Sequence, residues 1–153
     1  MALGLMTKIP GTLAVVVALA SLSACELDTF DSSYASVSDA AKDGMVVKRW
    51  IPPWVPLSGT DVREVHNLDS NASALSVDLP GAEELKLPVE CETVKYEDVV
   101  PNYFDRHWWP SELELENEYS FFQCPADAAD FVFVAIAVNG KRVLHWRTYM
   151  RPN

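Results

Sequence analysis

The sequence predicts an α+β domain built from an antiparallel sheet of four or five strands, one or two short helices and one disulfide. The clearest evidence is an unbroken apolar run from Phe131 to Val138, which ends in Asn139-Gly140 and is followed by a second extended segment from Lys141 to Tyr149. Asn139-Gly140 predicts a two-residue type I′ turn, which would place Ile136 opposite Val143 in a hairpin. Two shorter alternating segments between residues 61 and 79 flank a run of turn-forming residues. Because 49% of the 153 residues are apolar, the chain can form a packed core.

Residues 1–24 have the pattern of a secretory signal peptide. Lys8 is the only charged residue before Glu26, and an apolar run follows it at residues 9–22. This run is shorter than the roughly 20 apolar residues that a transmembrane helix needs. The pattern therefore predicts export rather than a membrane-spanning protein.

The apolar run ends in Leu22-Ser23-Ala24-Cys25. This tetrapeptide resembles the lipobox of bacterial lipoproteins. The resemblance implies that the thiol of Cys25 receives a diacylglyceryl group, that the chain is cleaved before Cys25, and that acyl chains such as palmitate anchor it in a membrane of the cell envelope. In a Gram-negative cell, Glu26 after the cysteine favours the outer membrane, with the domain in the periplasm. An ordinary secretory signal and an uncleaved anchor are the alternatives.

Residues 25–44 are rich in Ser, Asp and Ala, and their apolar residues follow no regular period. We expect a lipidated N-terminus and flexible tether over 25–44, followed by a single globular domain over 45–153. The prolines between Trp50 and Trp54 favour an extended segment laid over this domain. The two tryptophans either fasten that segment to the core or form a platform for a ligand.

After removal of the signal and lipidation of Cys25, two cysteines remain, Cys91 and Cys124. An even number in an oxidising compartment predicts a disulfide between them. Such a bridge would stabilise the domain by roughly 3–4 kcal/mol in the chain-entropy account. Two unpaired thiols, or half of a metal site, are the alternatives, although neither cysteine lies in a C-x-x-C pair.

Residues 83–118 carry eleven acidic side chains against three basic ones. Within this region, strict alternation predicts a strand whose glutamates share one side, and the alternative is a helical turn opened by Pro110-Ser111. An acidic row of this kind either attracts a cationic partner or keeps a sheet edge from pairing with other sheets. The glutamates concerned are Glu112, Glu114, Glu116 and Glu118. Just before them, residues 101–110 form the densest aromatic stretch of the chain.

A second polar group, at residues 61–69, contains residue types that bind metals: Asp61, Glu64, His66 and Asp69. No H-E-x-x-H or calcium-loop pattern is present, so a solvated hairpin explains them better, and we assign neither a metal nor a cofactor. The sequence also lacks G-x-S-x-G and S-x-x-K, so no catalytic residue is assigned.

The formal net charge of −10 argues against a nucleic-acid partner, because phosphate binding needs a basic surface. We expect a non-enzymatic binding or structural module of the envelope whose acidic face meets a cationic protein, as an inhibitor, immunity or assembly factor. The alternative is an envelope enzyme that uses His66 or His107 with carboxylates. Beyond the signal, three segments are similar to small secreted bacterial proteins of unassigned function, so the resemblance supplies no catalytic assignment: residues 56–62, 79–80 and 82–85.

Overall fold

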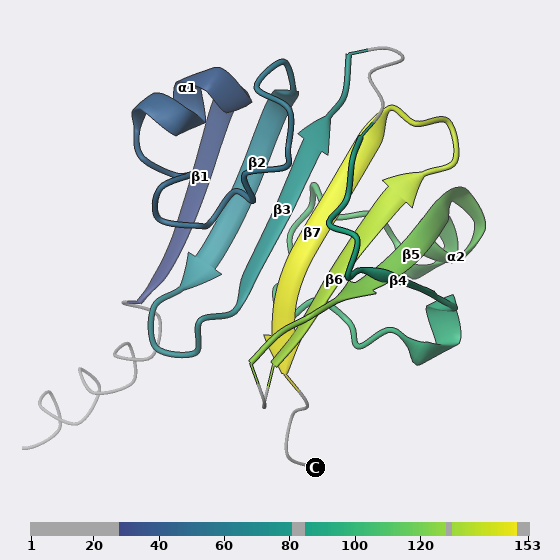
Figure 1. Ribbon diagram of the computed structural model, residues 1–153. Coiled ribbons are helices and arrows are strands. Elements are labelled where there is room, and N and C mark those ends of the chain that lie inside the picture. Colours follow the sequence, from purple (N-terminus) through teal and green to yellow (C-terminus); the bar gives the residue numbers. More distant parts are fainter. Residues whose placement is uncertain (1–27, 81–84, 128–129, 150–153) are drawn as a thin grey trace, which may run out of the picture.

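The computed structural model describes residues 28–80, 85–127 and 130–149. Within them, a single antiparallel sheet has seven strands in the order β1-β2-β3-β7-β6-β5-β4 (Figure 1). The sheet is larger than the predicted four or five strands, so the described fold is mostly β with two short α-helices. The elements are β1 (Thr29–Ser36), α1 (Val37–Lys42), β2 (Thr60–Asn67), β3 (Ser73–Asp78), β4 (Glu92–Val94), the 3₁₀ helix η1 (Tyr96–Asp98), α2 (Glu112–Glu118), β5 (Tyr119–Cys124), β6 (Asp130–Ala137) and β7 (Arg142–Tyr149).

The first strand shows that the prediction of a flexible tether over residues 25–44 is wrong from β1 onward. β1 pairs with β2 along its whole length. Ser36 then caps α1, because its hydroxyl accepts a hydrogen bond from the backbone N–H of Asp39 at 3.1 Å. Val37 and Ala40 of α1 are fully buried. An edge strand has one open side and needs few apolar residues, so its Ser- and Asp-rich composition concealed it.

Both predicted hairpins are confirmed. β2 pairs with β3 across residues 68–72, and β6 pairs with β7 in the predicted register, with Ile136 opposite Val143. The turn between β6 and β7 differs from the prediction. A two-residue type I′ turn needs a positive φ at both central positions, but Gly140 has a φ of 70° while Asn139 has no positive φ. The connection therefore spans residues 138–141, so β6 ends one residue earlier and β7 begins one residue later than predicted.

The predicted disulfide between Cys91 and Cys124 is present, with an S–S distance of 2.02 Å. Cys91 lies directly before β4, and Cys124 is the last residue of β5. β4 has three residues and occupies the edge of the sheet. The bridge therefore fastens a short edge strand to its neighbour, where few backbone hydrogen bonds would hold it.

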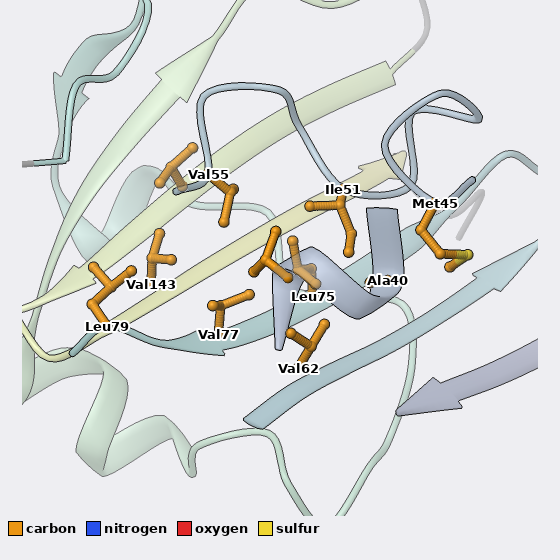
Figure 2. Close-up of a cluster of buried hydrophobic side chains, with 11 residues drawn as sticks. Ala40, Met45, Ile51, Val55, Val62, Leu75, Val77, Leu79 and Val143 are labelled. Atoms are coloured by element: carbon orange, nitrogen blue, oxygen red, sulfur yellow. The ribbon is translucent and has the colours of Figure 1, made fainter. Parts of the chain in front are cut away.

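The sheet is covered on both faces, and each face has its own core. α1 and residues 43–59 cover one face, which we call the α1 face, and residues 95–118 cover the opposite α2 face (Figure 1). Gly59 lies at a point of close approach on the α1 face, since a Cβ there would meet a methyl of Val77 at 2.6 Å. Figure 2 shows this core, whose buried members are Val37, Ala40, Met45, Ile51, Val55, Val62, Leu75, Val77, Leu79, Val134 and Val143.

The core of the α2 face is more aromatic. Trp146 of β7 stacks on Phe133 of β6 with ring centroids 5.3 Å apart, and both are almost completely buried. Burial of side chains of this size contributes roughly 1.5–3 kcal/mol each. The buried members are Val65, Ala72, Ala74, Phe104, Phe121, Phe133, Ala135, Leu144 and Trp146.

None of the described helices combines the length and the apolar composition needed to cross a membrane. The predicted signal peptide and Cys25 lie outside the described residues.

Candidate functional site

The glutamate-rich segment forms the helix α2, so the predicted strand is wrong and the alternative helical turn is right. Ser111 and Glu114 form a reciprocal capping box in which each side chain accepts a hydrogen bond from the other residue's backbone N–H, at 3.3 and 2.8 Å. Hydrogen bonds from the Ser111 hydroxyl and backbone lower the pKa of Glu114. The S-x-x-E signature of this box was visible in the sequence and outweighs the alternation of the following residues.

Helical geometry divides the four exposed glutamates into two pairs. Residues two apart differ by about 200° around a helix, whereas residues four apart share a side. Glu112 and Glu116 both raise the pKa of Tyr96, although burial has the larger effect on that phenol. Glu114 and Glu118 line a different cavity on the other side of α2. The glutamates thus form two acidic pairs rather than one row.

The cavity beside Glu114 and Glu118 is polar, with a volume of about 560 Å³. Its charges are already balanced in part. Arg142 of β7 pairs with Asp78 of β3 at 2.7 Å, and an exposed ion pair joins residues 61 and 63 of β2. His107 also lines this cavity. The acidic segment and the basic C-terminal hairpin therefore meet around this cavity, where the ion pairs of the described residues join Arg142 to Asp78 and Arg63 to Asp61.

A second cavity, of about 310 Å³, opens on the other side of α2, and we call it the aromatic cavity. Its charged lining residues are Asp105 and Glu112, both exposed, and neither forms an ion pair with a described residue. Trp109 lies between the two cavities and lines both. The aromatic rings around the cavity belong to Tyr96, Tyr103, Phe104, Trp109, Phe121 and Trp146.

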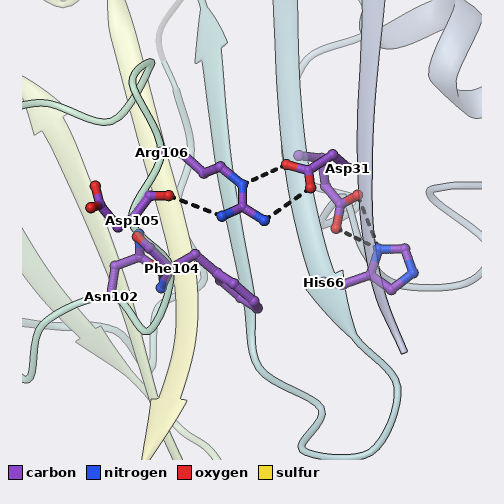
Figure 3. Close-up of polar contacts among 7 residues, drawn as sticks. Asp31, His66, Asn102, Phe104, Asp105 and Arg106 are labelled. Atoms are coloured by element: carbon purple, nitrogen blue, oxygen red, sulfur yellow. Dashed lines mark hydrogen bonds and ion pairs between the residues drawn. The ribbon is translucent and has the colours of Figure 1, made fainter. Parts of the chain in front are cut away.

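The segment that carries these rings is held to the sheet at two points and is braced internally at a third. The indole N–H of Trp146 donates to the carbonyl of Val100 at 3.0 Å, and the side chain of Asn102 bonds both backbone groups of Phe104. At the far edge of the sheet, the guanidinium of Arg106 makes two hydrogen bonds to the carboxylate of Asp31 in β1, at 2.7 and 2.9 Å (Figure 3). Side-chain contacts therefore fix a segment that has no regular secondary structure over the α2 face.

On the α1 face, Glu64 and His66 form a buried pair. The Nδ1 atom of His66 lies 2.9 and 3.0 Å from the two carboxylate oxygens of Glu64 (Figure 3). Trp50 stacks on the imidazole with centroids 4.0 Å apart, and Phe30 stacks at 5.5 Å. Burial, with a smaller contribution from Asp31, raises the pKa of Glu64 to about 8. Burial lowers the pKa of His66, so at neutral pH the pair shares one proton and carries no net charge.

Of the two interpretations of Trp50 and Trp54, their contacts with β2 and β7 support the one in which they fasten the extended segment to the core. Trp50 covers His66, and Trp54 meets His145 edge-on with centroids 6.0 Å apart, so both fasten residues 43–59 to the sheet. They also line a third cavity, of about 920 Å³. The Nδ1 atom of His145 is buried there with no hydrogen-bond partner in the described part of the chain, and burial lowers its pKa to about 4.

The polar hairpin group does not come together as a metal site. Glu64 and His66 touch, but Asp61 pairs with Arg63 at 2.9 Å instead. Among residues 28–80, 85–127 and 130–149, no three His, Cys, Asp or Glu side chains are arranged to hold a metal ion.

Comparison with known proteins gives one partial match. Residues 28–76 match the family model of the YbbD head domain. This is less than half of the chain; it spans β1, α1, β2 and most of β3, and includes Trp50, Glu64 and His66 but no residue of the aromatic cavity. Searches of curated proteins and of solved structures find nothing that matches the chain.

The glutamates and the aromatic stretch are each recognisable in the sequence, but their arrangement around one cavity is not. The cavity forms only in the folded chain, because three of its lining residues, Tyr96, Phe121 and Trp146, come from segments that are distant in the sequence. The local signal that could have suggested it is the capping box, which starts a helix directly after Trp109-Pro110 and sets Glu112 beside that tryptophan.

Proposed function

We propose that this chain is a lipid-anchored domain of the bacterial cell envelope that binds a cationic protein, as an inhibitor, immunity or assembly factor, and does not catalyse a reaction. The observation that carries the proposal is the charge on the side of α2 next to the aromatic cavity, which we call its outer side. Glu112 and Glu116 are exposed there one helical turn apart, Glu112 lines the aromatic cavity together with Asp105, and no described basic side chain forms an ion pair with any of the three. We call these three residues the acidic face.

The charge distribution supports recognition rather than internal pairing at this face. Lys141 and Arg142 lie with Glu114 and Glu118 around the polar cavity, where Arg142 adds to the capping hydrogen bonds in lowering the pKa of Glu114, whereas no basic residue lines the aromatic cavity beside Glu112. Uncompensated carboxylates on a rigid helix accelerate the encounter with a basic partner and disfavour acidic ones. The aromatic cavity adjoins them and adds apolar area that a partner could bury.

The partner is tested by placing a photoreactive amino acid at Leu113, which is 71% exposed on α2. We expect a cross-linked basic protein from intact envelopes. Its yield should fall in 0.5 M salt and in the Glu112→Gln, Glu116→Gln double variant, because the attraction is electrostatic. Val47 is the matched control position, since it is 85% exposed on the opposite face and should give no such adduct. A cross-link to an acidic protein, or a cross-linking yield that is unchanged in both high salt and the double variant, would refute the acidic face.

The anchor rests on the resemblance of Leu22-Ser23-Ala24-Cys25 to a lipobox. Several buried acyl chains hold a protein firmly on a membrane, at roughly 0.8 kcal/mol per methylene. A Cys25→Ser variant should therefore lose its acyl mass and leave the membrane fraction, whereas Cys91→Ser should stay membrane-bound. Unchanged membrane association of Cys25→Ser would refute the lipid anchor. In cells that export the protein to an outer membrane, we expect the domain to face the periplasm. Added protease should then digest it only after the outer membrane has been permeabilised.

His107 supports a second candidate, an envelope enzyme. It lines the polar cavity together with carboxylates from β2, β3 and α2, whereas His66 is covered by Trp50 and lines none of the described cavities. A general acid and base need this proximity. The test is turnover of chromogenic ester, glycoside and peptide substrates by the chain and by His107→Gln. Turnover that disappears in the variant would favour the enzyme over the binding module.

A further inference from the structure

We propose that the aromatic cavity receives one lysine or arginine side chain of the protein partner. The inference rests on the proposed function and specifies how the partner is recognised. Among the four described cavities, it is the one whose lining combines aromatic rings and carboxylates without any lysine, arginine or histidine.

The walls of the cavity suit an organic cation. A ring face carries partial negative charge, so a guanidinium or ammonium within about 6 Å of a ring centroid is attracted to it. Tyr96, Tyr103 and Trp109 are half-buried or exposed rings in the lining, whereas Phe121 and Trp146 are buried and form its inner side. The methylene stem of a basic side chain would lie against these inner rings while its charged end stays near the opening.

The same segment already holds one guanidinium over an aromatic ring. The Cζ atom of Arg106 lies 5.7 Å from the centroid of Phe104. This guanidinium is bound to Asp31 on β1 and does not line the aromatic cavity, so it leaves the cavity available. It shows that rings and carboxylates of this face combine to hold an arginine.

The charges of the lining select the sign of the ligand. Asp105 and Glu112 carry negative charge, and no lysine, arginine or histidine lines the cavity. The two larger cavities described above differ in this respect, because Lys141 and Arg142 line the polar cavity and Lys48 and Arg49 line the third cavity, beside Trp50 and Trp54. Glu116, on the same side of α2, adds to the negative potential that raises the pKa of Tyr96. A neutral apolar side chain would fill the space but gain nothing from the carboxylates.

The size of the cavity limits it to one side chain. Its volume of about 310 Å³ is at the lower end of the range for pockets that bind small molecules. A single extended basic side chain with part of its backbone fits this space, and a folded segment does not. The partner therefore presents its basic residue on an exposed loop or terminus.

The test is a titration of the purified full-length chain in detergent with short peptides, followed by the indole N–H resonances of its tryptophans. The probes are the acetylated, amidated tripeptides Gly-Arg-Gly and Gly-Lys-Gly, and the same peptides with citrulline or norleucine at the centre. We expect the indole resonance of Trp109 to shift with the arginine and lysine peptides. Binding of the neutral peptides should be weaker by roughly tenfold or more, as the loss of a desolvated cation–π contact and a charged rim predicts.

Two exposed substitutions test the rim without affecting the fold. The Asp105→Asn, Glu112→Gln double variant should weaken binding of the arginine peptide by roughly tenfold. The Glu90→Gln, Glu92→Gln double variant removes the same charge from exposed positions outside this cavity and should bind as the wild type does. Equal loss in both double variants would show that only the overall charge matters, and would overturn the inference.

The outcomes separate this inference from the proposed function. Equal binding of the norleucine and arginine peptides, or no binding of either, would overturn the cationic cavity. If the cross-link from Leu113 to a basic protein were still obtained in that case, the acidic face would remain as the recognition surface. If the arginine peptide binds selectively but no basic protein is cross-linked, the cavity is a cation site and the proposed protein partner fails.

Discussion

The buried pair of Glu64 and His66 makes the stability of the domain depend on pH in a way that can be worked out from its contacts. Glu64 is 1% exposed and its pKa is raised from 4.5 to about 8. A carboxyl whose folded pKa is raised contributes stability that is fully present below its unfolded pKa and is lost as the pH rises through the folded pKa. Between pH 4.5 and 8 the folded chain therefore holds a proton on Glu64 that the unfolded chain has released, and this group alone costs about 1.4 kcal/mol of stability per pH unit over that range.

The histidines act in the opposite direction at lower pH. The pKa of His66 is lowered, and that of His145 is lowered from 6.5 to about 4. The unfolded chain therefore takes up protons below pH 6.5 that the folded chain refuses, so stability falls as the pH drops through this range. Together the three groups predict maximal stability near pH 6.5 and a net loss of about 1 kcal/mol between pH 6.5 and 8, because the unfolded histidines still hold part of their protons there and Glu64 itself titrates near pH 8.

The measurement is urea denaturation, followed by tryptophan fluorescence, at pH values from 5 to 9. Glu64→Gln keeps an amide that can donate to Nδ1 of His66 but cannot ionise, so the fall above pH 6.5 should flatten in this variant. Glu92→Gln removes an exposed carboxylate of β4 and should keep the wild-type slope. The reasoning is refuted if Glu64→Gln and the wild type lose the same stability between pH 6.5 and 8.

Three further substitutions test other parts of the structure. Ser111→Ala removes the cap of α2 and should lower the free energy of unfolding by about 1 kcal/mol while raising the pKa of Glu114. Thermal denaturation measures the first effect and carboxyl titration by NMR the second, and the control variant Ser120→Ala in β5 should show neither. Cys91→Ser should cost about 3–4 kcal/mol and make stability insensitive to reductant, which denaturation with and without dithiothreitol would show; a reductant-sensitive variant would contradict the bridge. Trp50→Ala uncovers the imidazole of His66 and should raise its pKa, as an NMR titration would record, whereas Trp54→Ala should not.

The sequence was most informative where a signal is local. The Asn139-Gly140 hairpin and the β2–β3 hairpin followed from apolar patterning and turn formers, and even the register of Ile136 opposite Val143 was correct. The disulfide followed from the even cysteine count. β1 was not recognised, because an edge strand is stabilised by its partner and not by its own composition. In α2, the alternation of Leu and Glu suggested a strand, but the capping box and Pro110 decided for a helix.

The candidate sites depended on contacts that no local pattern contains. Glu64 and His66 have the spacing of neighbours on one side of a strand, so their proximity was predictable. Their burial was not, since it comes from Trp50 in a segment without regular structure. The aromatic cavity likewise needs residues from η1, β5 and β7 to meet. Long-range packing of irregular segments is the part of such a structure that sequence patterns describe least.

The pairing of β1 from Thr29 onward has a consequence for how the domain would stand on a bilayer. With an acylated Cys25, only four peptide steps separate the lipid from the sheet, a reach of about 14 Å at most. β1 starts at the end of the sheet where Asn67 closes β2, whereas α2 runs into β5 at the opposite end and near the opposite edge (Figure 1). The sheet would therefore rise from the headgroups at one corner and hold the glutamates of α2 at the corner diagonally above, directed toward the aqueous space.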